Sequence, residues 1–218
     1  MNINQVLPTL VLSVSLLVQS GLPISAKKQA QTLATRSMSL NKRYQDNFVN
    51  DVFKDNILLT LHYLNNSIKK GDQPDWQEIN KPYSFEVSVP PGKVFAFHDA
   101  VLPEFKDYVS KTTNAHFGPN EGFKSDGYLY GDGVCHLASL INWVARDAGL
   151  YVVSPVNHNF ANIPEVPKEY GVSILTQGEP TQASLMQNLY IKNIFDKPVS
   201  IKFVYDGVNL NTTVIKET

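Results

Sequence analysis

Apolar residues recur at helical spacing between residues 45 and 70, in the stretch QDNFVNDVFKDNILLTLHYLNNSIKK. Aspartate and lysine fill the positions between them, so the segment predicts an amphipathic helix that packs one stripe on a sheet. Gly71, Asp72 and Pro74 predict its end. His62 lies within the segment, and we interpret it as a structural residue. The predicted stripe consists of Phe48, Val52, Ile57 or Leu58, Leu61 and Leu64.

Alternating apolar and polar residues predict strands in two other regions. YSFEVSVP (residues 83–90) and KVFAFH (93–98) flank a Pro-Pro-Gly turn, which predicts a hairpin. Near the C-terminus, NLYIKNI, VSIKFVYD and NLNTTVIK alternate and are separated by turn residues, which predicts an antiparallel meander. Because no parallel strand–helix–strand rhythm is present, the predicted fold class is α+β.

The amino-terminal segment differs from the rest of the chain. Residues 6–18 (VLPTLVLSVSLLV) are apolar over a length that suits the core of a signal peptide, whereas a membrane-spanning helix needs about 20 residues. We therefore interpret residues 1–26 as a signal peptide or an N-terminal membrane anchor, which predicts an exported protein. Residues 27–42 are polar and are interpreted as a linker, followed by one domain over residues 43–218.

Composition excludes several classes of function. Nineteen Lys and Arg against twenty Asp and Glu give a net charge of −1, which offers no general attraction to nucleic acid. A single cysteine cannot form an internal disulfide, and the Cys and His spacings match no standard zinc pattern. We therefore predict neither a metal nor a cofactor.

The lone cysteine lies in YGDGVCHLAS, residues 130–139. Closely spaced glycines and aspartates, Asp126 among them, predict a turn with unusual backbone angles. Helical spacing of apolar residues follows Cys135, and Gly149 is a natural stop. We thus expect a central helix that starts at Cys135. Free N–H groups and the helix dipole at such a position stabilise a thiolate and lower the pKa of the thiol, so the position suits a nucleophile as well as a packed thiol.

A cysteine nucleophile needs a base, and chain length favours His158. A helix from residue 136 to 149 runs about 21 Å, and an extended return strand covers about 26 Å, which brings His158 level with Cys135. His136 adjoins the cysteine, but neighbouring residues of a helix point about 100° apart, so it is better placed to line the site. His116, in a polar loop, is the alternative base.

The segment GDGVCHLASLINWVARDAGLYVVSPVNHNF resembles the signature of VanW-like domains. In that family a Gly-Gly-Gly-Val-Cys-Gln run starts a helix, which closes with Ala-Gly-Leu, and a histidine follows a strand. Cys135, residues 148–150 and His158 fall on these positions. YSFEVSVPPGKVFAF and NLYIKNIFDKPVSIKF resemble the flanking strand pairs, so the resemblance spans residues 40–207.

The chain departs from the family pattern at several positions. His136 replaces the usual glutamine, Asp132 replaces a glycine, and Ser154-Pro155 stands where Glu-Arg is usual. The run Gly-x-Asp-Ala has no clear counterpart in KEYGVSI. The chain therefore resembles a variant branch.

The family, named from vancomycin-resistance clusters, implies cell-envelope chemistry on peptidoglycan stem peptides by cysteine-dependent L,D-transpeptidation. Cys135 would attack the acyl group and His158 would take the thiol proton; water as acceptor would make the protein a peptidase. The substrate-binding or supporting residues would be His136, His116, Gly133, Ser139 and Asp126. The alternative is a non-catalytic envelope module that binds cell-wall peptide or a protein through the loop TTNAHFGPNEGFKSDGY.

Overall fold

The computed structural model describes residues 30–176 and 181–218. The predicted signal or anchor at residues 1–26 lies outside the described residues. Among those that are described, no helix is both long enough and apolar enough to span a bilayer. The described chain is a mixed α+β structure with two four-stranded sheets.

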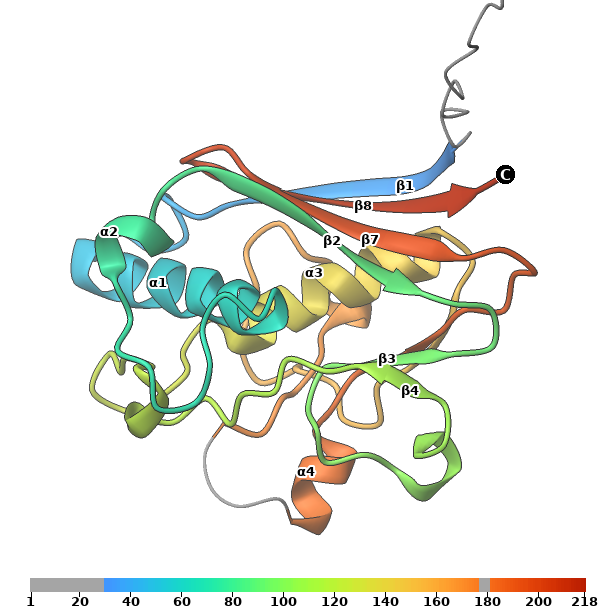
Figure 1. Ribbon diagram of the computed structural model, residues 1–218. Helices are drawn as coiled ribbons and strands as arrows, with labels where there is room; N and C mark the ends of the chain where they lie inside the picture. Colours follow the sequence, from blue (N-terminus) through green and yellow to red (C-terminus); the bar gives the residue numbers. More distant parts are fainter. Residues whose placement is uncertain (1–29, 177–180) are drawn as a thin grey trace, which may run out of the picture.

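The larger sheet has the strand order β1-β8-β7-β2, and all its neighbours are antiparallel (Figure 1). Its strands are β1 (Ala30–Ser39), β2 (Tyr83–Val89), β7 (Val199–Tyr205) and β8 (Asn209–Glu217). In β7 every second residue is buried, so one face of this sheet covers the core and the other faces solvent.

The smaller sheet has the order β4-β3-β6-β5. Its strands are β3 (Val94–Ala96), β4 (Val109–Lys111), β5 (Tyr151–Val153) and β6 (Tyr190–Lys192). The pair β3–β4 is parallel, and β3–β6 and β5–β6 are antiparallel. All three residues of β3 are buried, because this strand is covered on both faces.

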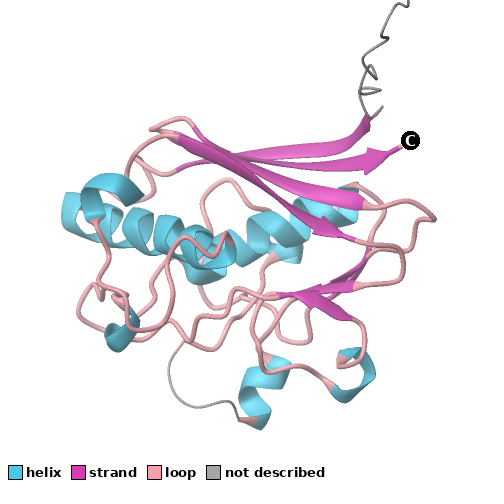
Figure 2. Cartoon of the chain, in the orientation of Figure 1, coloured by secondary structure: helices cyan, strands magenta, loops and turns pink. Residues whose placement is uncertain are grey.

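Two helices, α1 (Asn47–Leu64) and α3 (Val134–Asp147), lie between the sheets (Figures 1 and 2). The Asp46 side chain caps α1 by accepting hydrogen bonds from the N–H groups of Phe48 and Val49. Short helical segments occupy the connections: α2 (Trp76–Ile79), α4 (Gln182–Met186) and the 3-10 turns Pro103–Phe105, Pro119–Glu121 and Lys168–Tyr170.

The predicted amphipathic helix is present, but its stripe differs in one place. Val52, Ile57, Leu58 and the later leucines are buried in the core between the sheets. Phe48 is 62% exposed, because it lies in the first turn of α1, where the helix reaches the surface.

The linker interpretation of residues 27–42 is wrong for residues 30–39. These residues form β1, which pairs with β8 along its length, from Ala30 opposite Glu217 to Ser39 opposite Asn209. The strand is polar because it is an edge strand that exposes one side, and only its end, at Met38, is fully buried. The folded domain therefore begins before residue 43.

The predicted hairpin and meander are corrected as well. The turn at residues 90–92 carries the chain from β2 in one sheet to β3 in the other, and residues 193–198 do the same between β6 and β7. Asn193 links these two connections between the sheets, since its side-chain N–H groups donate to the carbonyl oxygens of Val89 and Lys197. Only β7 and β8 form the expected antiparallel neighbours.

Candidate functional site

Cys135 is the second residue of α3, which begins at Val134, one position before the predicted helix start. The preceding turn ends at Gly133, which has a φ of +95°. A Cβ at this position would lie 2.7 Å from the Phe53 carbonyl oxygen, so the close approach of α1 to the start of α3 requires glycine. Gly133 supports the site by fixing where α3 begins.

The Cys135 thiol contacts the backbone of Ile174. Its Sγ lies 3.4 Å from the Ile174 N–H, which donates to it, and 3.7 Å from the Ile174 carbonyl oxygen, to which the thiol donates. Burial raises the pKa of this thiol to about 11, although the Ile174 N–H acts in the opposite direction. The expected lowering of the thiol pKa by the helix terminus is therefore wrong: burial outweighs it, and the group is a neutral thiol at pH 7.

A cavity of about 340 Å³ opens beside the thiol. Residues from α1, α3, the turn before α3 and the segments around residues 158–161 and 173–176 surround it. The lining residues used below are Tyr44, Phe53, Tyr130, Asp132, Cys135, His136, His158 and Phe160. The cavity thus brings together residues that are far apart in the sequence.

His136 is buried and lines this cavity. Its Nδ1 accepts a hydrogen bond of 3.1 Å from the Nε of Arg43, whose side chain is fully buried. Burial, together with the nearby Arg43 and His158, lowers the pKa of His136 well below its ordinary value. The imidazole is therefore neutral, with its proton on Nε2.

His158 also lines the cavity and is 6% exposed. Its ring centroid lies 6.1 Å from that of His136 and 4.0 Å from that of Phe160. Burial lowers the pKa of His158, so this ring is neutral at pH 7 as well. Its Nδ1 is buried and has no hydrogen-bond partner within the described chain. The Cys135 thiol forms its hydrogen bonds with the Ile174 backbone and not with His158.

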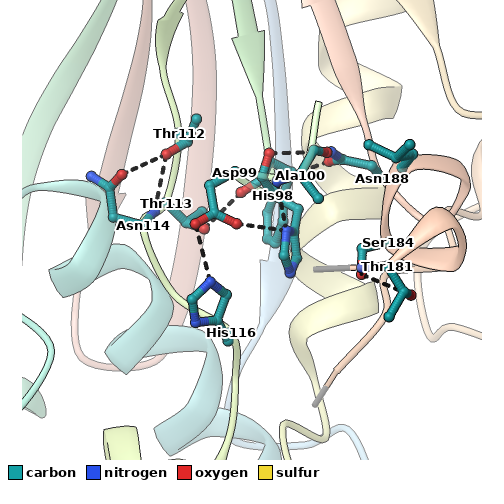
Figure 3. Close-up of polar contacts among 12 residues, drawn as sticks. His98, Asp99, Ala100, Thr112, Thr113, Asn114, His116, Thr181, Ser184 and Asn188 are labelled. Atoms are coloured by element: carbon teal, nitrogen blue, oxygen red, sulfur yellow. Dashed lines mark hydrogen bonds and ion pairs between the residues drawn. The ribbon is translucent and has the colours of Figure 1, made fainter. Parts of the chain in front are cut away.

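His116, the alternative base, does not line the cavity and belongs to a separate cluster (Figure 3). Its Nε2 lies 3.0 Å from Asp99 Oδ2, and its Nδ1 lies 3.5 Å from the buried Glu121 carboxylate. The other Asp99 oxygen lies 2.9 Å from His98 Nδ1. These contacts tie the loop at residues 112–121 to the end of β3, which is a structural role.

Ser139 and Asp126 support the framework around the site. The Ser139 hydroxyl donates to the Cys135 carbonyl oxygen at 2.7 Å and accepts from the Val172 N–H at 2.9 Å. This places the segment after Val172 against the thiol. The Asp126 N–H donates to Asp132 Oδ2 at 3.1 Å, which shapes the turn before α3.

The sequence reasoning missed two residues of the site. Arg43 holds His136, and Tyr44 lines the cavity, yet both fall at the boundary of the interpreted linker. No spacing relative to Cys135 could have indicated them, because they reach the site through the pairing of β1 with β8.

No protein-family model, curated protein or solved structure matched this chain. The resemblance to VanW-like domains stays a prediction. Over the described ranges, no group of three or more His, Cys, Asp and Glu side chains is arranged to hold a metal ion.

Proposed function

We propose that this protein is an exported cell-envelope protein that carries out cysteine-dependent acyl transfer on peptidoglycan stem peptides, as the resemblance to VanW-like domains implies. The observation that supports the proposal is the shared cavity. A thiol and an imidazole, Cys135 and His158, line it together, and both are neutral at pH 7. A neutral imidazole is a base that can take the proton of a neutral thiol as the thiol attacks.

The proposed reaction has two steps. Cys135 Sγ attacks the carbonyl carbon of a donor stem peptide while His158 takes the thiol proton, which then passes to the departing amine as the peptide C–N bond breaks. The amine of an acceptor peptide attacks the resulting thioester, loses its proton to His158, and restores the thiol as a new amide forms. Water in place of the acceptor amine would give hydrolysis.

His136 has a supporting role in this proposal. Because its Nδ1 accepts from Arg43, its Nε2 carries the proton, and a neutral N–H donor in the cavity can stabilise the oxyanion that forms on the attacked carbonyl. His136 thereby provides a hydrogen-bond donor at the position where the family has a glutamine amide.

A non-catalytic binding module is the second candidate, and two observations favour it. The raised pKa of Cys135 leaves little thiolate at pH 7. Tyr128, Leu129 and Phe160 are strongly exposed, and the latter two line the cavity. Exposed aromatic and aliphatic side chains beside a cavity are typical of a surface that binds a partner.

Incubation with a synthetic stem tetrapeptide separates the two candidates. Intact mass spectrometry should show a covalent adduct on the wild-type chain and none on Cys135→Ala. His158→Gln should form the adduct at least about a hundredfold more slowly, since general-base catalysis contributes that much or more. His62→Gln, whose ring lies outside the cavity and contacts Ser67, is the matched control and should react like the wild type.

Reversible binding of the tetrapeptide without an adduct on any variant would favour the binding module. Equal adduct formation by the His158→Gln and His62→Gln variants would refute His158 as the base.

A further inference from the structure

Asp132 is the one lining residue of the Cys135 cavity, among those described, that carries a formal charge at pH 7. The two histidines of the cavity are neutral. Arg43 does not line the cavity, and its guanidinium contacts His136, the Ser39 and Pro164 carbonyl oxygens and Glu165. Among the described lining residues, the formal charge is therefore negative.

The Asp132 carboxylate forms hydrogen bonds with the backbone and the side chain of Asp126. Its Oδ2 accepts from the Asp126 N–H, and no ion pair with a cation is found for it within the described chain. Lys124, the nearest lysine in sequence, pairs with Asp55 and lies over the Trp76 ring. Burial raises the pKa of Asp132 to about 6, and the charge of Asp126 contributes to the rise.

Aromatic residues line the same cavity as Asp132. Tyr44 and Phe53 pack with centroids 4.6 Å apart, and Phe53 continues to His136 at 5.0 Å. Burial raises the pKa of Tyr44; the positive charge of Arg43 acts in the opposite direction, and the negative charge of Asp132 adds a smaller rise. Tyr130 and Phe160 also line the cavity and are exposed.

A cavity lined by an aspartate and several aromatic residues suits an organic cation, because ring faces and a carboxylate both attract positive charge. The unpartnered Nδ1 of His158 provides an independent observation. This ring is more than nine-tenths buried and lines the same cavity. With its proton on Nε2, such a neutral ring accepts a hydrogen bond, which an ammonium N–H can donate.

We propose that the cavity is a recognition site for the primary ammonium group of a ligand, bound by the Asp132 carboxylate and the rings of Tyr44 and Tyr130. That this ligand is the substrate of Cys135 rests on the proposed function; the ammonium site itself does not. At the position of Asp132 the VanW-like pattern has a glycine, so this recognition would be specific to the variant branch that the chain resembles.

The test uses the full chain carrying Cys135→Ala, which blocks covalent reaction, and Nα-acetyl-lysinamide as the probe. Its Nε-acetylated form is the matched neutral probe. Binding is measured by titration calorimetry and by the change in tyrosine fluorescence at pH 7.5. We expect millimolar affinity for the ammonium probe and at least about tenfold weaker binding of the neutral one.

Asp132→Asn keeps the shape of the side chain and removes its charge, and it should lose about tenfold in affinity for the ammonium probe alone. Asp107→Asn removes one exposed charge outside the cavity and should leave the affinity unchanged. Raising the salt concentration should weaken binding of the ammonium probe to the chain that retains Asp132, and should not change its binding to the Asp132→Asn variant.

Equal affinity for both probes, or no loss in Asp132→Asn, would overturn the ammonium site. A preserved site in a protein that forms no adduct with stem peptide would instead refute only the acyl transfer.

Discussion

Removing strand β1 tests whether residues 30–40 belong to the folded domain. The informative comparison is between a chain that begins at Lys28 and keeps all of β1, and one that begins at Asn41 and lacks it. The shorter chain loses Met38 and Leu40, which are 1% and 0% exposed. Burial of each side chain contributes about 1.5–3 kcal/mol, so their removal costs about 3–6 kcal/mol.

Other losses add to this figure. Strand β8 becomes an edge along the register from Asn209 to Glu217, which leaves its backbone groups facing water. Asp147 loses its ion pair with Arg36, and Trp143 loses the Arg36 guanidinium 4.5 Å from its ring centroid, although such partly exposed contacts contribute less than about 1 kcal/mol each. Because domains are stable by about 5–15 kcal/mol in total, the loss is a large part of the whole.

The deletion should also disturb the site. The Ser39 carbonyl oxygen accepts from Arg43 at 2.9 Å, and Arg43 in turn holds His136. Without Ser39, the buried guanidinium loses one of its acceptors, and the orientation of His136 is no longer fixed. Deletion of β1 is therefore expected to alter the cavity through the side chains of Arg43 and His136.

Urea denaturation followed by circular dichroism provides the measurement. We expect the chain that begins at Lys28 to unfold in one cooperative transition, and the chain that begins at Asn41 to be unfolded or destabilised by at least about 3 kcal/mol. Equal midpoints for the two chains would show that β1 adds nothing to stability and would refute this reasoning.

Two further predictions concern single residues. Gly133→Ala should lower the free energy of unfolding by about 2–4 kcal/mol in urea denaturation, because the residue has a positive φ and an added Cβ would lie 2.7 Å from the Phe53 carbonyl oxygen. Gly127→Ala is the control: Gly127 has a φ of +116° with open space around it, so this change should cost only about 1 kcal/mol of backbone strain. The hydrogen bond from His98, with the nearby His116, lowers the pKa of Asp99 from 3.8 to about 2. The ionised Asp99 therefore stabilises the fold fully above pH 4, and this contribution is lost as the pH falls toward 2. The melting temperature of Asp99→Asn should depend less on pH in this window than that of the wild type, and an equal dependence would contradict the assignment.

Local sequence patterns determined the parts of the fold that depend on neighbouring residues. The apolar spacing of residues 45–70 and the Asp46 cap specify α1, because a helix is formed by contacts within a few positions. The glycine-rich turn before Cys135 and the apolar spacing after it specify the start of α3 to within one residue. The same reasoning predicted that the chain returns His158 to the level of Cys135, and both residues line one cavity.

Only the tertiary structure decided which strands pair. Alternation shows that a segment is extended, but it does not show which sheet receives it; β2 and β3 look like a hairpin and enter different sheets. The polar pattern of residues 30–39 suits a linker as well as an edge strand, and the partner β8 lies at the far end of the chain.

The thiol of Cys135 shows the same division between local and distant causes. Its place at a helix terminus, a local property, lowers the pKa, and from sequence this is the only visible influence. The segment around Ile174 packs against the sulfur of the partly buried Cys135, and burial, which raises the pKa of the thiol, is the larger effect. The charge state of the candidate nucleophile is therefore determined by residues about forty positions away, which meet it only in the folded protein.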